Sequence, residues 1–174
     1  SPYAVTKVVN ELYANVFAKT YGFKTIGLRY FNIFGKRQNP DSEYSAVIPV
    51  FCRKIINNQT CVINGKGDTS RDFTYVDNAV IANLLALKSE LNTHQVFNIG
   101  CGSNYSLNNL VEKLEEISAK KITVKYGLER KGDVKHSHAN IDKANSLLNF
   151  EPVVSFEEGL NLTYKYYSNL ENEK

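Results

Sequence analysis

A tyrosine and a lysine near the start of the chain have the residue types and the spacing needed for proton transfer. Tyr3 and Lys7 are four residues apart, so on a helix they project from one face, a single turn apart. A free phenol is a poor base at neutral pH because its pKa is about 10, but a neighbouring ammonium favours the phenolate. Such a pair can take a proton from an alcohol while a hydride leaves the same carbon. The same spacing is common on ordinary exposed helices, so the pair needs support from the rest of the chain.

Helices and strands alternate along the sequence, which indicates an α/β fold. Ser1 and Pro2 can start the helix that carries this pair, and Gly22 can end it. Strands are expected at residues 25–34, 61–64, 71–73, 95–99 and 122–126. Further helices are expected at residues 49–57, 77–88 and 106–118, and after Asp142 and Ser155. Gly65 and Gly67 are interpreted as a hairpin turn. The helix over 77–88 has an apolar stripe that consists of Val80, Ile81, Leu84, Leu85 and Leu87.

The composition narrows the class of protein. With 174 residues, 43% of them hydrophobic, the chain can bury a core and is expected to be globular. Its net charge of +3 comes without a run of one sign, which argues against nucleic acid or a membrane as a partner. No segment approaches the roughly 20 apolar residues of a membrane span. We therefore expect a soluble, cytoplasmic protein. The chain starts at Ser1 and contains no methionine, so we expect an upstream segment to be missing.

Three features that imitate known sites are interpreted as structural. Gly100-Cys101-Gly102 follows a strand and precedes a helix, as a dinucleotide-binding turn does, but it lacks the third glycine and the acid about 20 residues further on. His136 and His138 lack the further ligands that a metal site needs. The three cysteines are an odd number in no close pair, so they are interpreted as small core residues and not as a disulfide scaffold.

Several motifs, in the correct order, resemble the extended short-chain dehydrogenase/reductase family. Residues 1–7 read SPYAVTK, and residues 28–35 read LRYFNIFG, which is similar to the catalytic helix and the following strand of that family. Later blocks also match: TSRDF at 69–73, VDNA at 76–79, VFNIG at 96–100 and R-x-G-D at 130–133. The resemblance covers essentially the whole chain. Within the family the sequence is most similar to the UDP-hexose 4-epimerases, particularly those acting on UDP-N-acetylglucosamine and its galacto epimer.

The resemblance implies a role for each residue that matches a family motif. Tyr3 would be the acid/base, Lys7 would lower its pKa and bind the cofactor ribose, and Tyr30 would lie against the nicotinamide. The nucleotide and diphosphate of the substrate would be held by a larger set: Asn32, Val47, Ile48, Pro49, Val62, Asn64, Arg71, Arg130 and Asp133. The two arginines suit this role because their paired N–H groups match phosphate oxygens.

Ser137 leads to an expectation about the sugar. In the family, the residue four positions after the Asp of R-x-G-D lines the sugar pocket, where a bulky side chain crowds a 2-acetamido group. Because serine is small, the resemblance implies UDP-N-acetylhexosamine substrates, and plain UDP-glucose or UDP-galactose are further candidates.

The resemblance also implies that this chain is the C-terminal half of an enzyme. The glycine-rich cradle for NAD and the Ser/Thr of the catalytic triad are absent, and both belong upstream of the tyrosine. Residues 1–45 and 76–100 would complete a Rossmann core, and residues 46–75 and 101–174 would mainly form the substrate-binding lobe. The chain alone should be inactive, whereas the full-length enzyme would be a homodimer that binds NAD and a UDP-sugar.

Two alternatives remain open. A nucleotide-sugar 4,6-dehydratase or a uronate epimerase would share Tyr3, Lys7 and the fold. In a different class, the chain would be a non-catalytic module that binds UDP or another protein.

Overall fold

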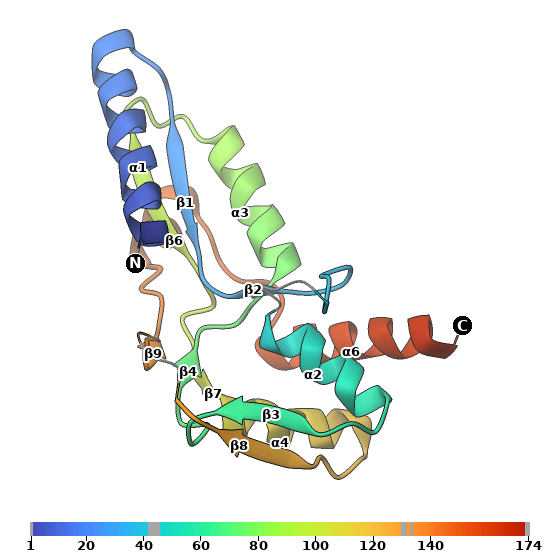
Figure 1. Ribbon diagram of the computed structural model, residues 1–174. Coiled ribbons are helices and arrows are strands. Elements are labelled where there is room, and N and C mark those ends of the chain that lie inside the picture. Colours follow the sequence, from blue (N-terminus) through green and yellow to red (C-terminus); the bar gives the residue numbers. More distant parts are fainter. Residues whose placement is uncertain (1, 42–45, 130–131, 133, 173–174) are drawn as a thin grey trace.

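The computed structural model describes residues 2–41, 46–129, 132 and 134–172, and it shows the expected α/β fold. Its helices and strands form two groups, an upper and a lower one in Figure 1, with short strands between them. Each group has its own hydrophobic core. Among the described residues, none of the helices combines the length and the apolar character needed to cross a membrane.

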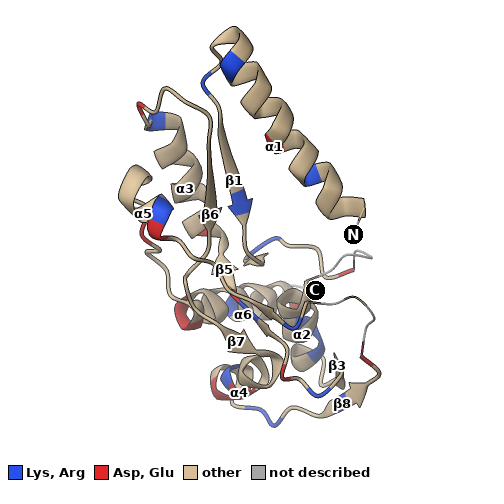
Figure 2. Ribbon diagram, turned by 90° about the vertical axis from the view of Figure 1, so that its left-hand side faces the viewer, with Lys and Arg blue, Asp and Glu red and all other residues tan. Residues whose placement is uncertain are grey.

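The upper group is built on one pair of parallel strands. Its elements are α1 (Pro2–Tyr21), β1 (Ile26–Tyr30), α3 (Val76–Lys88), β6 (Gln95–Ile99) and α5 (Asp142–Leu148). β1 pairs with β6 so that Leu28 lies opposite Phe97. Figures 1 and 2 show α1 and α3 on opposite sides of this pair. The small core, to which α5 contributes, consists of Ala82, Phe97, Ile99, Ala144, Leu148 and Phe150.

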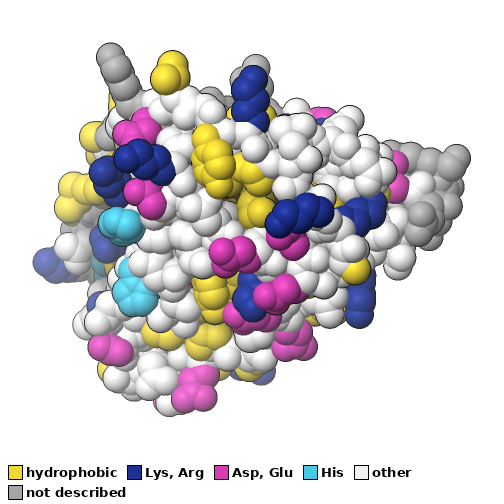
Figure 3. Space-filling model, turned by 90° about the horizontal axis from the view of Figure 1, so that it is seen from below, with side chains coloured by type: hydrophobic (Ala, Val, Ile, Leu, Met, Phe, Trp, Pro, Cys, Tyr) yellow, Lys and Arg dark blue, Asp and Glu magenta, His cyan; other side chains and the backbone are white. Residues whose placement is uncertain are grey.

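The lower group holds the larger core. Its elements are α2 (Val47–Ile56), β3 (Cys61–Asn64), α4 (Leu107–Ser118), β8 (Val124–Gly127) and α6 (Phe156–Asn172). β3 pairs in parallel with β8, and α2 packs along α6. Ile48, Leu110 and Leu160 are fully buried between these elements. On the outer face of the molecule seen in Figure 3, acidic and basic side chains are interspersed and the hydrophobic ones lie in small groups.

Five short strands lie between the two groups: β2 (Ile33–Phe34), β4 (Ser70–Arg71), β5 (Thr74–Tyr75), β7 (Tyr105–Ser106) and β9 (His136–Ser137). β2 pairs in parallel with β5, while β4 lies between β7, which is antiparallel to it, and β9, which is parallel. Segments that are far apart in the sequence therefore meet between the upper and the lower group.

Two sequence-based predictions are wrong, one of a strand and one of a turn. The single strand predicted over residues 25–34 is broken at Asn32, whose φ of 39° lies in the left-handed region and separates β1 from β2. Gly65 and Gly67 do not form a hairpin turn, because β3 pairs with β8 and β4 pairs with β7 and β9. The partners of β3 and β4 come from far along the chain, which a local turn motif cannot reveal.

The apolar stripe of α3 is largely uncovered. Val80, Leu84 and Leu87 are 51%, 50% and 82% exposed, and the residues that the helix buries are small, namely Asn78, Ala79 and Ala82. Leu85 packs partly against the small core, and the small buried side chains form the rest of the packed face and allow α3 to lie close to the strands.

α1 makes few contacts with the rest of the structure. None of its described residues is buried, although it carries many apolar side chains. Its polar link to β1 is the pair of hydrogen bonds that Arg29 donates to the two carboxylate oxygens of Glu11, each 2.6 Å long. These hydrogen bonds lower the pKa of Glu11, while partial burial opposes that shift. A long amphipathic helix with an uncovered apolar face is a surface suited to packing against further protein.

Candidate active site

Tyr3 and Lys7 lie on one face of the first turns of α1, as their spacing predicts. The Lys7 ammonium nitrogen is 5.0 Å from the centroid of the Tyr3 ring, so the two side chains lie against each other. Tyr3 is 70% exposed. In Figure 1 the start of α1 lies at the same end of the upper group as the carboxyl ends of β1 and β6. That end of a parallel sheet is where ligands commonly bind in α/β proteins.

Tyr30 ends β1 and is held by α3. Its hydroxyl donates to Asn83 Oδ1 at 3.0 Å and lies 2.8 Å from Asn83 Nδ2, and that amide also donates to the carbonyl of Ala79. Asn83 therefore fixes the direction of the Tyr30 ring, which remains 47% exposed. Asn83 was not among the residues singled out from the sequence. Its position within a helix, among apolar residues, is the only sequence signal that marks it.

Asn32 forms the bend that separates β1 from β2. Its side-chain amide donates to the backbone carbonyl of Asp72 at 3.1 Å. Asparagine tolerates the left-handed conformation better than most residues, and here its side chain also bonds the neighbouring segment. The bend that follows β1 is thereby tied to the strand that carries Arg71.

Arg71 and Ser137 are brought together by strand pairing. They are directly opposite each other in the parallel pair of β4 and β9. The Asp72 amide donates to the Ser137 carbonyl at 2.8 Å, which fixes this register. One guanidinium nitrogen of Arg71 donates to the carbonyls of Ser70 and Lys135, so the side chain is directed along the sheet. Both residues are half-buried.

The remaining predicted binding residues lie in the lower group or outside the described residues. Ile48 and Pro49 are buried in the first turn of α2, and Val47 packs partly against the same core. On β3 the side chains alternate, so Val62 is exposed and Asn64 is half-buried, while Cys61 and Ile63 are buried. The structural contacts of these residues are therefore mainly those of packing. Arg130 and Asp133 lie outside the described residues.

Asp72, which has no role assigned from the sequence, lies between Asn32, Arg71 and Ser137. Asp72 is fully buried, and its carboxylate accepts hydrogen bonds from the backbone amides of Cys101, Gly102 and Ala139. Burial raises the pKa of the Cys101 thiol, and the negative charge of Asp72 adds to that shift. The sequence shows an acid between Arg71 and the apolar Phe73, and this pattern alone does not distinguish a buried acid with internal partners from an exposed one.

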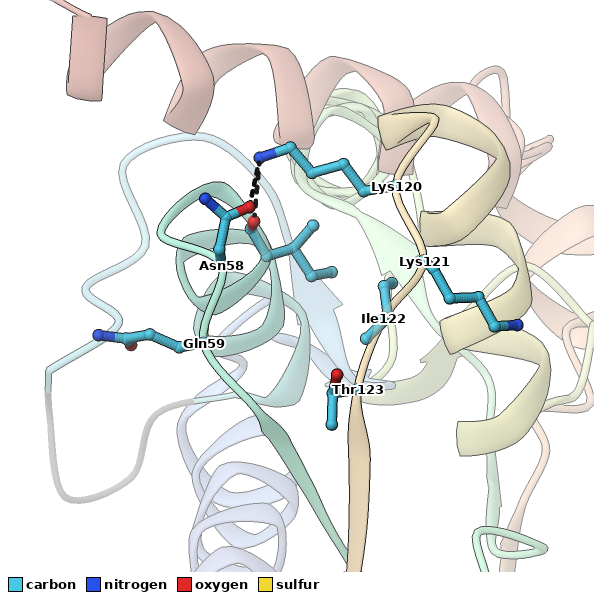
Figure 4. Close-up of a pocket in the computed structure, with 7 residues that line it drawn as sticks. Asn58, Gln59, Lys120, Lys121, Ile122 and Thr123 are labelled. Carbon is cyan, nitrogen blue, oxygen red and sulfur yellow. Dashed lines mark hydrogen bonds between the residues drawn. The ribbon is translucent and has the colours of Figure 1, made fainter.

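A separate small cavity lies away from these residues, between the C-terminal ends of α2 and α4. It measures about 200 Å³ and is lined by Ile55, Asn58, Gln59, Lys120, Lys121, Ile122 and Thr123. Figure 4 shows that the Lys120 ammonium points to the end of α2, where it donates to the carbonyls of Ile55 and Ile56 and to Asn58 Oδ1. Lys120 thus caps a helix terminus. None of the predicted site residues lines this cavity.

Comparisons with known proteins agree on one family. Residues 1–100 match the model of the NAD-dependent epimerase/dehydratase family. A putative UDP-glucose 4-epimerase of Methanocaldococcus jannaschii is 34% identical over 169 residues, which are 97% of this chain and 54% of that protein. The chain thus spans about half the length of the relatives it matches.

Solved structures show the same likeness. A UDP-N-acetylglucosamine 4-epimerase from Methanobrevibacter ruminantium, in complex with UDP-N-acetylmuramic acid, superposes with a TM-score of 0.92 at 42% identity and covers 98% of this chain and 54% of its own. A UDP-glucuronic acid 4-epimerase from Bacillus cereus, in complex with UDP-glucuronic acid and NAD, superposes with a TM-score of 0.86 at 34% identity. That match covers 98% of this chain and 53% of the other.

Proposed function

The chain belongs to the NAD-dependent epimerase/dehydratase family, and we propose that the full-length protein interconverts UDP-sugars that differ in configuration at C4. The observation that carries this proposal is the Tyr3–Lys7 pair, in which the ammonium lies 5.0 Å from the phenol ring on an exposed face of α1. A phenol can exchange a proton with a sugar hydroxyl, and an ammonium beside its ring supplies a positive charge close to the reaction. The similar proteins named as UDP-sugar 4-epimerases support this assignment.

In the proposed reaction, Tyr3 takes the proton from the C4 hydroxyl of the sugar and returns it after the configuration at C4 has changed. Lys7 balances the negative charge that develops on the phenol oxygen during this transfer. Because the same residue serves as base and then as acid, the protein ends each cycle in its starting protonation state. The nucleotide must stay bound throughout, since only the sugar has to turn.

The residues at this end of the upper group fit the nicotinamide end of NAD. Tyr3 and Lys7 are exposed on the first turns of α1, at the same end of the upper group as the carboxyl ends of β1 and β6. Tyr30 ends β1 and is also exposed, and its hydroxyl is bonded to Asn83 of α3, on the other side of the strands. When bound, NAD supplies the acceptor and donor of the hydride at C4. The glycine turn at 100–102 does not fit its pyrophosphate, because two amides of that turn are already bonded to Asp72. We therefore assign the pyrophosphate site to the upstream half of the protein.

The substrate nucleotide is assigned to the residues around β4 and to the segment that follows β8. Arg71 and Arg130 would bond the diphosphate, Asn32 would bond it from the bend after β1, and Asp133 would accept from the ribose hydroxyls. The binding site for the uracil and ribose would be lined by Val47, Ile48, Pro49, Val62 and Asn64. Of this set, Val47, Val62 and Asn64 retain exposed surface for a ligand.

The proposed sugar is an N-acetylhexosamine. Ser137 is small and half-buried, and it lies in register with Arg71, so the proposed sugar pocket next to the diphosphate has room for an acetamido group. The 42% identical solved relative is named as a UDP-N-acetylglucosamine 4-epimerase. A second candidate substrate is UDP-glucuronate, because a solved relative at 34% identity is named for that sugar.

The uncovered surfaces of the upper group suggest where the rest of the enzyme lies. We propose that the upstream half pairs with the free edge of β1 and packs on α1, and that a second copy completes a homodimer. Among the described residues β1 pairs with β6 alone, and α1 has no buried residue. All three cysteines are free thiols, which suits a cytoplasmic enzyme.

Turnover by the purified full-length protein tests the proposal. It would be incubated with NAD and, separately, with UDP-N-acetylglucosamine, UDP-glucose and UDP-glucuronate, and the products identified by NMR. We expect the 4-epimer of the acetylated sugar at the highest kcat/KM. Preference for UDP-glucuronate would establish the second candidate, and a 4-keto-6-deoxy product would indicate a dehydratase. UDP binding without turnover would identify a non-catalytic module and contradict the proposal.

A further inference from the structure

Asp72 has a side chain that bonds two segments besides its own. Its exposed fraction is 0%. Oδ1 accepts from the Cys101 amide at 2.9 Å, while Oδ2 accepts from the Gly102 amide at 3.0 Å and the Ala139 amide at 3.2 Å. The Thr74 hydroxyl lies 3.5 Å from Oδ1. Hydrogen bonds from amides to a buried carboxylate are charge-assisted and stronger than neutral ones. The turn after β6 and the segment after β9 are thus fastened to β4.

The glycine turn after β6 is shaped to receive this carboxylate. A Cβ added at Gly100 would lie 2.7 Å from Asp72 Oδ2 and 2.6 Å from the Ala139 Cβ. Only glycine therefore fits while the carboxylate keeps its place. The turn that imitates a dinucleotide-binding motif in the sequence uses its amides on an internal anion instead.

The backbone of Asp72 reaches the proposed substrate residues directly. Its carbonyl accepts from Asn32 Nδ2 at 3.1 Å, and its amide donates to the Ser137 carbonyl at 2.8 Å. Arg71 precedes it in the chain and lies opposite Ser137. Three residues from three separate segments therefore meet around the backbone of Asp72, whose buried carboxylate is held by three amides.

We infer that Asp72 is a positioning residue of the substrate site, which holds Arg71, Ser137 and Asn32 in their mutual arrangement. It acts through these residues and does not itself touch the substrate. Its effect on substrate binding rests on the proposed function, whereas the fastening of the segments is a property of the protein without ligand.

Replacing the carboxylate by an amide tests the inference in the full-length protein. In Asp72→Asn one oxygen becomes an N–H₂ group, so at least one backbone amide faces a donor in place of an acceptor. Asp68→Asn, which changes an exposed acid in the preceding loop, is the matched control. In the ligand-free protein, hydrogen exchange in segments 100–102 and 136–139 should rise by about ten-fold or more in Asp72→Asn only.

Ligand binding provides the second readout. Calorimetry with UDP should give a Kd about ten-fold higher for Asp72→Asn, with a parallel rise in KM. The value of kcat should change less than about three-fold, because Tyr3 and Lys7 lie on α1. In an Arg71→Lys background the effect of Asp72→Asn on the UDP Kd should be much smaller, since residues that act together are not additive. Equal effects in both backgrounds, or a loss confined to kcat, would overturn the inference.

A second variant keeps the inference testable if Asp72→Asn does not fold. Gly100→Ala keeps the carboxylate, but its added Cβ would clash with it. Hydrogen exchange in the same two segments should therefore rise, and the UDP Kd should also rise. If the unsubstituted full-length protein bound no UDP, the proposed function would fail. Hydrogen exchange would still test the role of Asp72. Unchanged exchange of segments 100–102 and 136–139 in both Asp72→Asn and Gly100→Ala would overturn the inference.

Discussion

Arg71 and Ser137 lie directly opposite each other on the neighbouring parallel strands β4 and β9. Residues in register on adjacent strands project from the same face of a sheet. A guanidinium, which suits a phosphate, and a small hydroxyl side chain, which leaves room for a sugar substituent, therefore lie next to each other. The proposed UDP-sugar site follows from this pairing, and its parts can be tested separately.

The first prediction concerns the guanidinium of Arg71. Arg71→Lys keeps the positive charge but removes the paired N–H groups that match phosphate oxygens, so the UDP Kd of the full-length protein should rise roughly ten-fold. Calorimetry measures it. Arg53→Lys is the matched control, since Arg53 lies in α2 and pairs with Asp41, which precedes that helix. A UDP affinity that Arg71→Lys leaves intact would remove Arg71 from the site.

The second prediction concerns the sugar. Ser137→Tyr fills the space proposed for the acetamido group, so kcat/KM for UDP-N-acetylglucosamine should fall by about 100-fold or more, while that for UDP-glucose changes little. Ser146→Tyr, on the exposed surface of α5, is the control. The pocket assignment would be wrong if Ser137→Tyr kept its full activity on the acetylated sugar.

The third prediction concerns the close approach of α6 to β5. A Cβ at Gly159 would lie 2.8 Å from three atoms of Tyr75, which is fully buried. Gly159→Ala should therefore lower the free energy of unfolding by about 1–3 kcal/mol, although alanine is the better helix former. Denaturant unfolding measures this. Asn169→Ala, at an exposed position of α6, should leave stability unchanged or raise it slightly.

The fourth prediction concerns pH and the link between α1 and β1. Hydrogen bonds from Arg29 lower the pKa of Glu11 below 4.5 in the folded protein. The stability from this pair is therefore present above the unfolded-state pKa and is lost as pH falls through the lower, folded-state pKa. Since both groups are partly exposed, Glu11→Gln should cost about 0.2–1 kcal/mol at pH 7.

Thermal unfolding of the full-length protein from pH 7 down to pH values below 4 measures this difference. The gap between the unsubstituted protein and Glu11→Gln should narrow as the solution becomes more acidic. Glu90→Gln, an exposed acid outside α1, should show no comparable gap. A gap that widens towards acid would contradict the role of the Glu11–Arg29 pair.

Local signals were sufficient to predict most helices and their ends. α1 ends at Tyr21, and Gly22 follows it with a φ of 69°, as expected of a glycine cap. Ser106 caps α4, with the Asn109 side chain completing a capping box. The Ser155 hydroxyl accepts from the Glu158 amide at the start of α6. Each of these features depends on residues within a few positions of one another, so a sequence displays them directly.

The pairing of strands that are far apart in the chain cannot be predicted from such local signals. The family motifs predict that Arg71 and Ser137 belong to one site, but no local pattern in the sequence indicates that β4 lies between β7 and β9. The role of Asp72 depends on amides that are presented by the turn after β6 and by Ala139. Backbone amides carry no residue-specific signal, so in the sequence a carboxylate that binds them resembles any other acid.

The most direct test of the proposed epimerase is the removal of one oxygen atom. In Tyr3→Phe of the full-length protein the ring remains and only the phenol hydroxyl is lost. The rate kcat should fall by about 10²–10⁴-fold while the Kd for UDP stays the same, and Tyr13→Phe on the same helix should behave like the unsubstituted protein. A Tyr3→Phe protein that turns over UDP-N-acetylglucosamine at the unsubstituted rate would contradict the proposal that Tyr3 transfers the proton.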